Sequence, residues 1–230
     1  MIELSELKKA AAEKAVEFVE DGMVLGLGTG STTYFAVEAI GRLVKQGYKL
    51  QGVPTSKATE EQARRLGIPL LELDQVESID LTIDGADEVD GNLDLIKGMG
   101  GALLREKMVA YISEKEIIVV DDSKIVDVLG TRSPLPIEVT RFGHGRTRKH
   151  LEELGCEPEL KGGAEPFITD NGNIIYNCRF DIIENPYSLE MQLKQIPGVV
   201  ETGLFLRMAT CVVIAGKDGI RIRERWKTKK

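Results

Sequence analysis

Short apolar segments alternate with helical segments from residue 20 to residue 124, and this alternation restricts the fold more than any other feature of the chain. Each apolar segment ends in a run of glycine, hydroxyl or acidic residues. Strands that alternate with helices in this way pair in parallel, because each helix returns the chain to the edge where the previous strand began. We therefore predict an α/β fold with a doubly wound, mostly parallel, Rossmann-like sheet.

The expected helices cover residues 3–20, 31–44, 57–67 and the segment that opens at the glycines of 97–101, and the expected strands cover 23–28, 49–54, 68–74, 78–84 and 116–121. Gly67 is expected to end its helix as a C-cap. The loops after four of the strands read GTGST, GVPTS, DGADEVD and DDSK. In a parallel sheet such loops meet at the carboxyl edge, where ligands bind, so we expect the functional site there.

The pattern changes at Pro134 and Pro136, which mark an expected boundary. Residues 137–206 read as βαββαβ with an Asn-Gly turn in DNGN (170–173), the order of a ferredoxin-like unit. Residues 210–224 read as strands that return to the first sheet. The predicted domains are thus an α/β catalytic domain of residues 1–131 and 207–230 and an inserted, smaller ferredoxin-like α+β domain of residues 132–206.

The composition excludes several classes of protein. A net charge of −7 argues against a nucleic-acid or membrane partner, and the basic C-terminal tail, RIRERWKTKK, is interpreted as a solvated face. The chain contains no long apolar segment, and its N-terminus reads as an amphipathic helix rather than a signal peptide. Its three scattered cysteines read as buried thiols in a reducing compartment, so we expect a cytoplasmic protein. Its two histidines are too few to indicate a metal site.

The segment GLGTGSTT, residues 26–33, is a glycine-rich turn between a strand and a helix and predicts an anion site. Dinucleotides, nucleoside triphosphates and sugar phosphates all use such turns. A dinucleotide fingerprint would need a further glycine after Gly30, and a P-loop would need a lysine. The hydroxyls that remain suit a small phosphate group, although Ser31 or Thr32 could also cap the helix.

The acidic turn DGADEVD, residues 84–90, has two interpretations. Such clusters can bind a divalent metal, but this one lacks the ligand spacing of a calcium loop. Alternatively, Asp84 accepts hydrogen bonds from sugar hydroxyls at the carboxyl edge of the sheet. For Glu88 and Asp90 we expect a solvated turn.

The segment KGMGGALLREK, residues 97–107, is the most informative of the chain. Its glycines let backbone amides approach a ligand, and Lys97 adds a positive charge, an arrangement that stabilises negative charge developing during a reaction. Glu106 could act as a base, or could be an ordinary ion-pairing residue between two cations. A base, a cationic oxyanion site and a phosphate anchor together suggest proton abstraction next to a sugar carbonyl, without a metal or redox cofactor.

Four motifs carry a resemblance to the ribose-5-phosphate isomerase type A family, in this order and spacing: GTGST, DGADE, KGMGGALLREK and DDSK. The resemblance extends to LGTRSPLPIEV, TDNGN and IPGVVETGLF. It implies an enzyme that interconverts D-ribose 5-phosphate and D-ribulose 5-phosphate through an enediolate, with neither metal nor cofactor. The implied substrate-binding residues are Thr29, Gly30, Ser31, Thr32, Asp84, Gly85, Ala86, Asp87, Lys97, Gly98, Met99, Gly100, Lys124 and, as a weaker match, Lys8.

The resemblance also implies catalytic roles. Glu106 would move a proton between C1 and C2, Lys97 would stabilise the enediolate oxygen, and Asp84 would assist ring opening. Lys124 would bind the phosphate. Met99 departs from the family, which more often has glycine there, and its side chain could narrow the pocket.

Two other functions fit parts of this pattern. A noncatalytic sugar-phosphate sensor would not need Lys97 and Glu106. A nicotinamide-dependent oxidoreductase would need the missing glycine and an acidic residue after the second strand. Family members are commonly dimers or tetramers, so we also expect a homodimer or homotetramer.

Overall fold

The structure is a computed structural model that describes residues 4–225, and its chain forms two compact units. The α/β unit comprises residues 4–85, 105–124 and 207–225. The α+β unit comprises residues 86–104 and 125–206. The predicted domain boundaries at 131/132 and 206/207 stay a prediction, and the compact units differ from them in grouping 86–104 and 125–131 with the ferredoxin-like segment.

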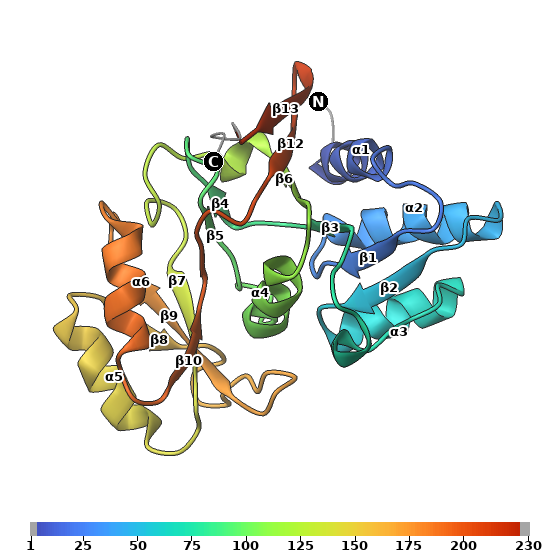
Figure 1. The fold of residues 1–230 in the computed structure, drawn as a ribbon. Helices are drawn as coiled ribbons and strands as arrows, with labels where there is room; N and C mark the ends of the chain where they lie inside the picture. The colour runs from blue at the N-terminus through green and yellow to red at the C-terminus, as the bar shows by residue number, and fades with distance from the viewer. Residues whose placement is uncertain (1–3, 226–230) are drawn as a thin grey trace. The chain divides into compact units, whose positions relative to one another are not determined.

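The α/β unit is built on a six-stranded sheet with the order β13-β12-β6-β3-β1-β2 (Figure 1). All neighbouring strands are parallel except β13, which pairs antiparallel with β12 at the edge of the sheet. The strands are β1 (Val24–Leu27), β2 (Gln51–Pro54), β3 (Leu81–Asp84), β6 (Glu116–Asp121), β12 (Cys211–Gly216) and β13 (Gly219–Glu224). The doubly wound, mostly parallel sheet expected from the sequence is thereby confirmed, as is the return of residues 210–224 to it.

The central strands β6 and β12 are buried along their whole length, which agrees with their runs of branched aliphatic residues, whereas the edge strand β13 is exposed. On one face, Leu25 and Leu27 of β1 join a core with the helices α1 (Leu4–Val16) and α2 (Thr33–Lys45). On the other face, Val24 packs in a second cluster with α4 (Leu103–Tyr111).

The helix α3 (Lys57–Leu66) shows why the local sequence could be interpreted correctly. The Ser56 hydroxyl accepts a hydrogen bond from the backbone N–H of Thr59 at its start. Gly67 adopts a left-handed conformation, with φ 78°, at its end, which confirms the predicted C-cap.

The α+β unit contains a four-stranded antiparallel sheet with the order β10-β7-β9-β8. Its elements follow the chain as β7 (Leu135–Val139), α5 (His144–Glu153), β8 (Glu157–Leu160), β9 (Ile174–Arg179), α6 (Pro186–Lys194) and β10 (Val199–Thr202). This is the βαββαβ order of a ferredoxin-like unit, as predicted. A three-stranded sheet in the order β11-β5-β4 completes the unit, from β4 (Glu88–Val89), β5 (Leu95–Ile96) and β11 (Leu204–Phe205).

Two local expectations differ from the structure. Residues 68–74 do not form a strand: Leu70 makes a single parallel bridge to Gly52, and a 3₁₀ turn, η1 (Leu73–Gln75), follows. The Asn-Gly turn is present, with Gly172 at φ 82°, but it lies at the end of a long connection between β8 and β9 instead of joining them directly.

No helix within residues 4–225 is long and apolar enough to cross a membrane. The end of the basic tail, residues 226–230, lies outside the described part of the chain.

Candidate active site

The phosphate loop, residues 26–33, connects β1 to α2 at the point where the order of the sheet reverses. The parallel strands lie in the order β2-β1-β3-β6-β12. From β1 the chain passes to β2 at one edge of the sheet, and from β3 it passes to β6 in the direction of the other edge. Ligands in such sheets bind beyond the carboxyl ends of the strands at this switch point. The loops after β1 and β3 are GTGST and DGADEVD, the first and third of the loops predicted to carry the site.

Asp84 ties these two loops together from the end of β3. Its side chain is 1% exposed, and its Oδ1 accepts hydrogen bonds from the backbone N–H of Thr29 at 3.2 Å and of Gly85 at 2.7 Å. A Cβ on Gly28 would lie 2.4 Å from this Oδ1, so the residue before Thr29 has to be glycine. Asp84 therefore fixes the shape of the phosphate loop.

The phosphate loop presents unused backbone donors. Within residues 4–225, the backbone N–H groups of residues 30–33, at the start of α2, donate no hydrogen bond to a backbone or side-chain acceptor. Free N–H groups at a helix N-terminus attract anions. The alternative role as a helix cap is wrong for Thr32, since it occupies the N-cap position without a side-chain hydrogen bond. Ser31 instead accepts a hydrogen bond from Lys8 Nζ at 2.8 Å, so α1 contributes a positive charge to this loop.

The Thr29 side chain makes its hydrogen bonds within the protein, with hydroxyl groups that follow β2. Its hydroxyl lies 2.8 Å from the hydroxyls of Thr55 and Ser56 and 3.1 Å from that of Thr59. In addition, Thr55 donates to the carbonyl of Leu27 and Thr59 to that of Gly28, both at 3.0 Å. This hydroxyl cluster was not predicted, although the run of hydroxyl residues in GVPTSKAT is its signal in the sequence.

Two further charged residues that the sequence analysis assigned to the site, Lys124 and Glu106, belong to the α/β unit. Lys124 follows β6 in a 3₁₀ turn, η2 (Asp122–Lys124), and within residues 4–225 its ammonium has no hydrogen-bond or ion-pair partner. Glu106 lies on α4 and is 4% exposed. The neighbouring Lys107 is also buried, at 7% exposed, so burial agrees with both the base and the ion-pairing interpretation, and the catalytic role of Glu106 stays a prediction.

The glycine loop, residues 97–101, belongs to the α+β unit. Hydrogen bonds to the backbone N–H and C=O groups of Met99 hold it in place. The backbone N–H of Met99 donates to Asp87 Oδ2 at 3.0 Å, and its carbonyl accepts from Lys161 Nζ at 2.6 Å. Gly100 is exposed, and no atom lies within 4 Å of the position that its Cβ would occupy. Met99 lines a cavity of about 560 Å³ together with Pro134 and residues of α5, β8 and β9.

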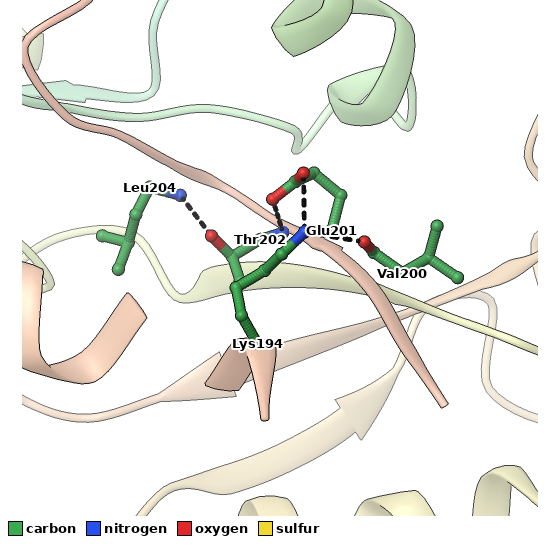
Figure 2. Close-up of polar contacts among 5 residues, drawn as sticks. All are labelled: Lys194, Val200, Glu201, Thr202 and Leu204. Atoms are coloured by element: carbon green, nitrogen blue, oxygen red, sulfur yellow. Dashed lines mark hydrogen bonds and ion pairs between the residues drawn. The ribbon is translucent and has the colours of Figure 1, made fainter. Parts of the chain in front are cut away.

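Lys97 is 2% exposed, and its Nζ lies 5.2 Å from the centre of the Phe205 ring. Its backbone N–H donates to the carbonyl of Gly203 at 2.9 Å. Figure 2 shows how the segment around Gly203 is fixed: Lys194 Nζ donates to the Val200 carbonyl and the Glu201 carboxylate, and Leu204 N–H donates to the Thr202 hydroxyl. The position of this buried lysine thus depends on a strand more than 100 residues further along the chain.

The expectation of a solvated turn at Glu88 and Asp90 is wrong. Glu88 is 0% exposed and accepts hydrogen bonds from the backbone N–H groups of Gly130, Arg132 and Ser133 at 2.5–2.6 Å. Asp90 Oδ1 accepts from Asn92 and Asp94, both at 2.8 Å. Both carboxylates supply acceptors for buried loop backbone, a requirement that the sequence does not reveal.

No group of three or more His, Cys, Asp or Glu residues within residues 4–225 is arranged to hold a metal ion. The predicted residues divide between the two units. Lys8, residues 29–32, Asp84, Gly85, Glu106 and Lys124 belong to the α/β unit, whereas Ala86, Asp87 and residues 97–100 belong to the α+β unit.

The sequence model of the family described as ribose 5-phosphate isomerase A (phosphoriboisomerase A) matches residues 51–219. A protein of Bacillus mycoides named ribose-5-phosphate isomerase A is 52% identical over 217 residues, covering 94% of this chain and 98% of that protein. This chain belongs to the ribose 5-phosphate isomerase A family. It is therefore an enzyme of the isomerase class, and the resemblance inferred from its motifs is confirmed.

Solved structures agree with this assignment to the ribose 5-phosphate isomerase A family. A D-ribose-5-phosphate isomerase in complex with phospho-erythronic acid has a TM-score of 0.94 at 41% identity, with 97% of this chain and 100% of that chain covered. The ribose 5-phosphate isomerase A of Neisseria gonorrhoeae has a TM-score of 0.92 at 39% identity, with coverage of 99% and 100%.

One relative, from Arabidopsis thaliana, is named a probable chloroplastic ribose-5-phosphate isomerase and is 52% identical over 227 residues, covering 94% of this chain and 82% of that protein. The cytoplasmic location of this chain stays a prediction.

Proposed function

We propose that this chain interconverts D-ribose 5-phosphate and D-ribulose 5-phosphate through an enediolate, with Glu106 as the base and without a metal ion. The observation that carries the proposal is the burial of two opposite charges, Lys97 and Glu106, nine positions apart in one glycine-rich segment. Aldose–ketose isomerisation needs a base for a carbon-bound proton and a positive partner for the oxygen that becomes negative.

In the proposed reaction, Glu106 removes the proton from C2 of the open-chain aldose. The electron pair of that C–H bond forms the C1–C2 double bond, and O1 becomes negative beside Lys97 and the amides of the glycine loop. The proton on O2 passes to O1, and Glu106 returns its proton to C1 as C2 becomes the carbonyl. The reaction is balanced without an external oxidant or reductant.

Substrate binding is assigned to the remaining residues. The free amides of Gly30, Ser31 and Thr32, with the charges of Lys8 and Lys124, would bind the 5-phosphate. Asp84 would assist ring opening. The loop from Gly85 to Asp87 and the amides of Gly98 and Gly100 would hold the hydroxyls and the reacting carbonyl. Met99, whose N–H is donated to Asp87, would contribute by fixing the orientation of this loop. The contacts of Thr29 support the loop, so its contribution would come from its backbone.

The deciding experiment measures ketose formation from D-ribose 5-phosphate by purified protein in excess chelator. Robust turnover is expected, because every role in the proposed mechanism is filled by a side chain or amide of the chain. Turnover that returns only after addition of a divalent ion would assign metal chemistry to residues 84–90 and overturn the mechanism. Binding of the sugar phosphate without turnover under either condition would contradict the proposed reaction.

We also propose that the chain is a homodimer or homotetramer, as the resemblance implied. Light scattering on protein eluting from a size-exclusion column measures the mass directly. A mass near the 25.3 kDa of one chain would contradict the proposal.

A further inference from the structure

The connection between β8 and β9 reaches the glycine loop at two points. Lys161 Nζ donates to the Met99 carbonyl at 2.6 Å. The ring of Phe167 lies directly against Gly101, since a Cβ on Gly101 would be 2.4 Å from Phe167 Cε1. Neither Lys161 nor Phe167 belongs to the motifs that predicted the site.

This connection is itself ordered by local contacts. The backbone N–H of Phe167 donates to the Lys161 carbonyl at 2.8 Å, and the N–H of Lys161 donates to the carbonyl of Ile175 in β9 at 2.9 Å. The Lys161 ammonium lies 5.2 Å from the centre of the Phe167 ring, within the range of a cation–π contact. The Lys161 side chain therefore approaches the Met99 carbonyl from a defined direction.

The contact at the Met99 carbonyl determines where the next amide points. The peptide bond between Met99 and Gly100 is trans, so its C=O and N–H point in opposite directions. With Asp87 holding the Met99 N–H at 3.0 Å and Lys161 holding its C=O, the N–H of Gly100 points away from Lys161. Gly100 is exposed, which leaves this N–H available to a ligand.

We infer that Lys161 is a positioning residue, which aims the Gly100 N–H at the oxygen that becomes negative during isomerisation. This inference rests on the proposed function of the glycine loop. The ammonium also polarises the peptide group whose carbonyl it binds, which strengthens the N–H as a donor. A donor of this kind acts more strongly on the enediolate than on the neutral carbonyl, so its loss lowers kcat more than it raises KM.

The test compares Lys161→Met, which removes the charge and the hydrogen bond, with Lys161→Arg, which retains both. For K161M we expect kcat to fall about 10-fold with less than about a threefold change in KM, because the Gly100 donor is misdirected but not removed. K161R should recover most of kcat. Lys149→Met, at an exposed lysine of α5 in the same unit, is the matched control and should behave like the wild type.

An inhibition measurement separates positioning from a general loss of structure. Phospho-erythronic acid carries a carboxylate whose charge is shared by two oxygens, as in an enediolate. Its inhibition constant should rise in K161M by the same factor as kcat falls, while inhibition by inorganic phosphate stays unchanged. A merely structural role would weaken both ligands.

The outcomes distinguish this inference from the proposed function. A wild-type enzyme that does not isomerise D-ribose 5-phosphate contradicts the proposed function itself. An active wild type with normal kcat in K161M, or a loss that K161R does not restore, overturns the role of Lys161 alone. Should K161M fail to fold, Lys161→Gln, which keeps a shorter uncharged donor, takes its place with the same expected split between kcat and KM.

Discussion

Glu106 is a buried carboxylate on a helix that begins directly after the glycine loop. Glu106→Gln preserves its shape but removes the basic oxygen, so we expect turnover to fall by about 10²–10⁴-fold with substrate binding retained. Steady-state kinetics and direct titration of D-ribose 5-phosphate give the two quantities. The control is Glu114→Gln, at an exposed glutamate of the same unit. Near-normal turnover in E106Q would remove Glu106 from the mechanism.

Lys124 is the cation at the carboxyl end of β6 that has no partner within residues 4–225. An ammonium that contacts a phosphate dianion contributes a charge-assisted hydrogen bond, so Lys124→Ala should raise KM by about 10-fold or more and change kcat little. Lys115→Ala, at an exposed lysine just before the same strand, should leave both constants unchanged. A K124A enzyme with normal KM would place the phosphate elsewhere.

At the scale of elements, the segment of β10 and β11 supports the glycine loop. A Cβ on Gly203 would lie 2.3 Å from the carbonyl oxygen of Lys97 and 2.9 Å from Pro136 Cδ. Gly203→Ala therefore has to displace the backbone of Lys97 or of β7. We expect a loss of about 1–3 kcal/mol in the free energy of unfolding and a fall in kcat.

Gly91→Ala provides the matched control for G203A. Gly91 lies in the same unit, and its Cβ would meet no atom within 4 Å. Denaturant unfolding and kinetics on both variants separate the specific clash from the general effect of adding a methyl group. Equal stability and equal kcat in the two variants would show that the Lys97 backbone does not depend on Gly203.

At the scale of the whole molecule, a buried thiol makes stability depend on alkaline pH. Burial raises the pKa of Cys211, in the central sheet, from 9.0 to about 11. In the unfolded chain the thiol keeps its ordinary pKa, so it ionises there first. Its contribution to stability is complete below about pH 9 and is lost as the pH rises through about 11.

The expected loss is at most about 3 kcal/mol, from 1.36 kcal/mol for each unit of pKa difference. Denaturant unfolding at about pH 8 and about pH 11 measures it, and Cys211→Ala should reduce the difference between the two pH values. The comparison isolates Cys211, because Cys156 and Cys178 remain in both proteins. An identical pH dependence in C211A would show that this thiol does not ionise on unfolding.

The sequence by itself determined the parallel sheet, the ferredoxin-like unit, the family and the order of the site motifs. It did so because those features depend on local patterns: the period of the apolar residues, the Gly67 cap of α3, and glycines beside strand ends. The prediction of a strand at 68–74 was wrong because its apolar residues satisfy the pattern, while in the fold only Leu70 pairs with β2.

Only the tertiary structure showed which polar side chains hold other parts of the chain in place. Thr29 turned inward to Thr55 and Thr59, Glu88 proved to be a buried acceptor for the loop at 130–133, and Lys161 came to the carbonyl of Met99. The physical reason is shared by all of them. Each of these polar groups is wholly or partly removed from solvent and has a hydrogen-bond partner within the chain. That partner lies 26 to 62 residues away, where no local pattern can identify it.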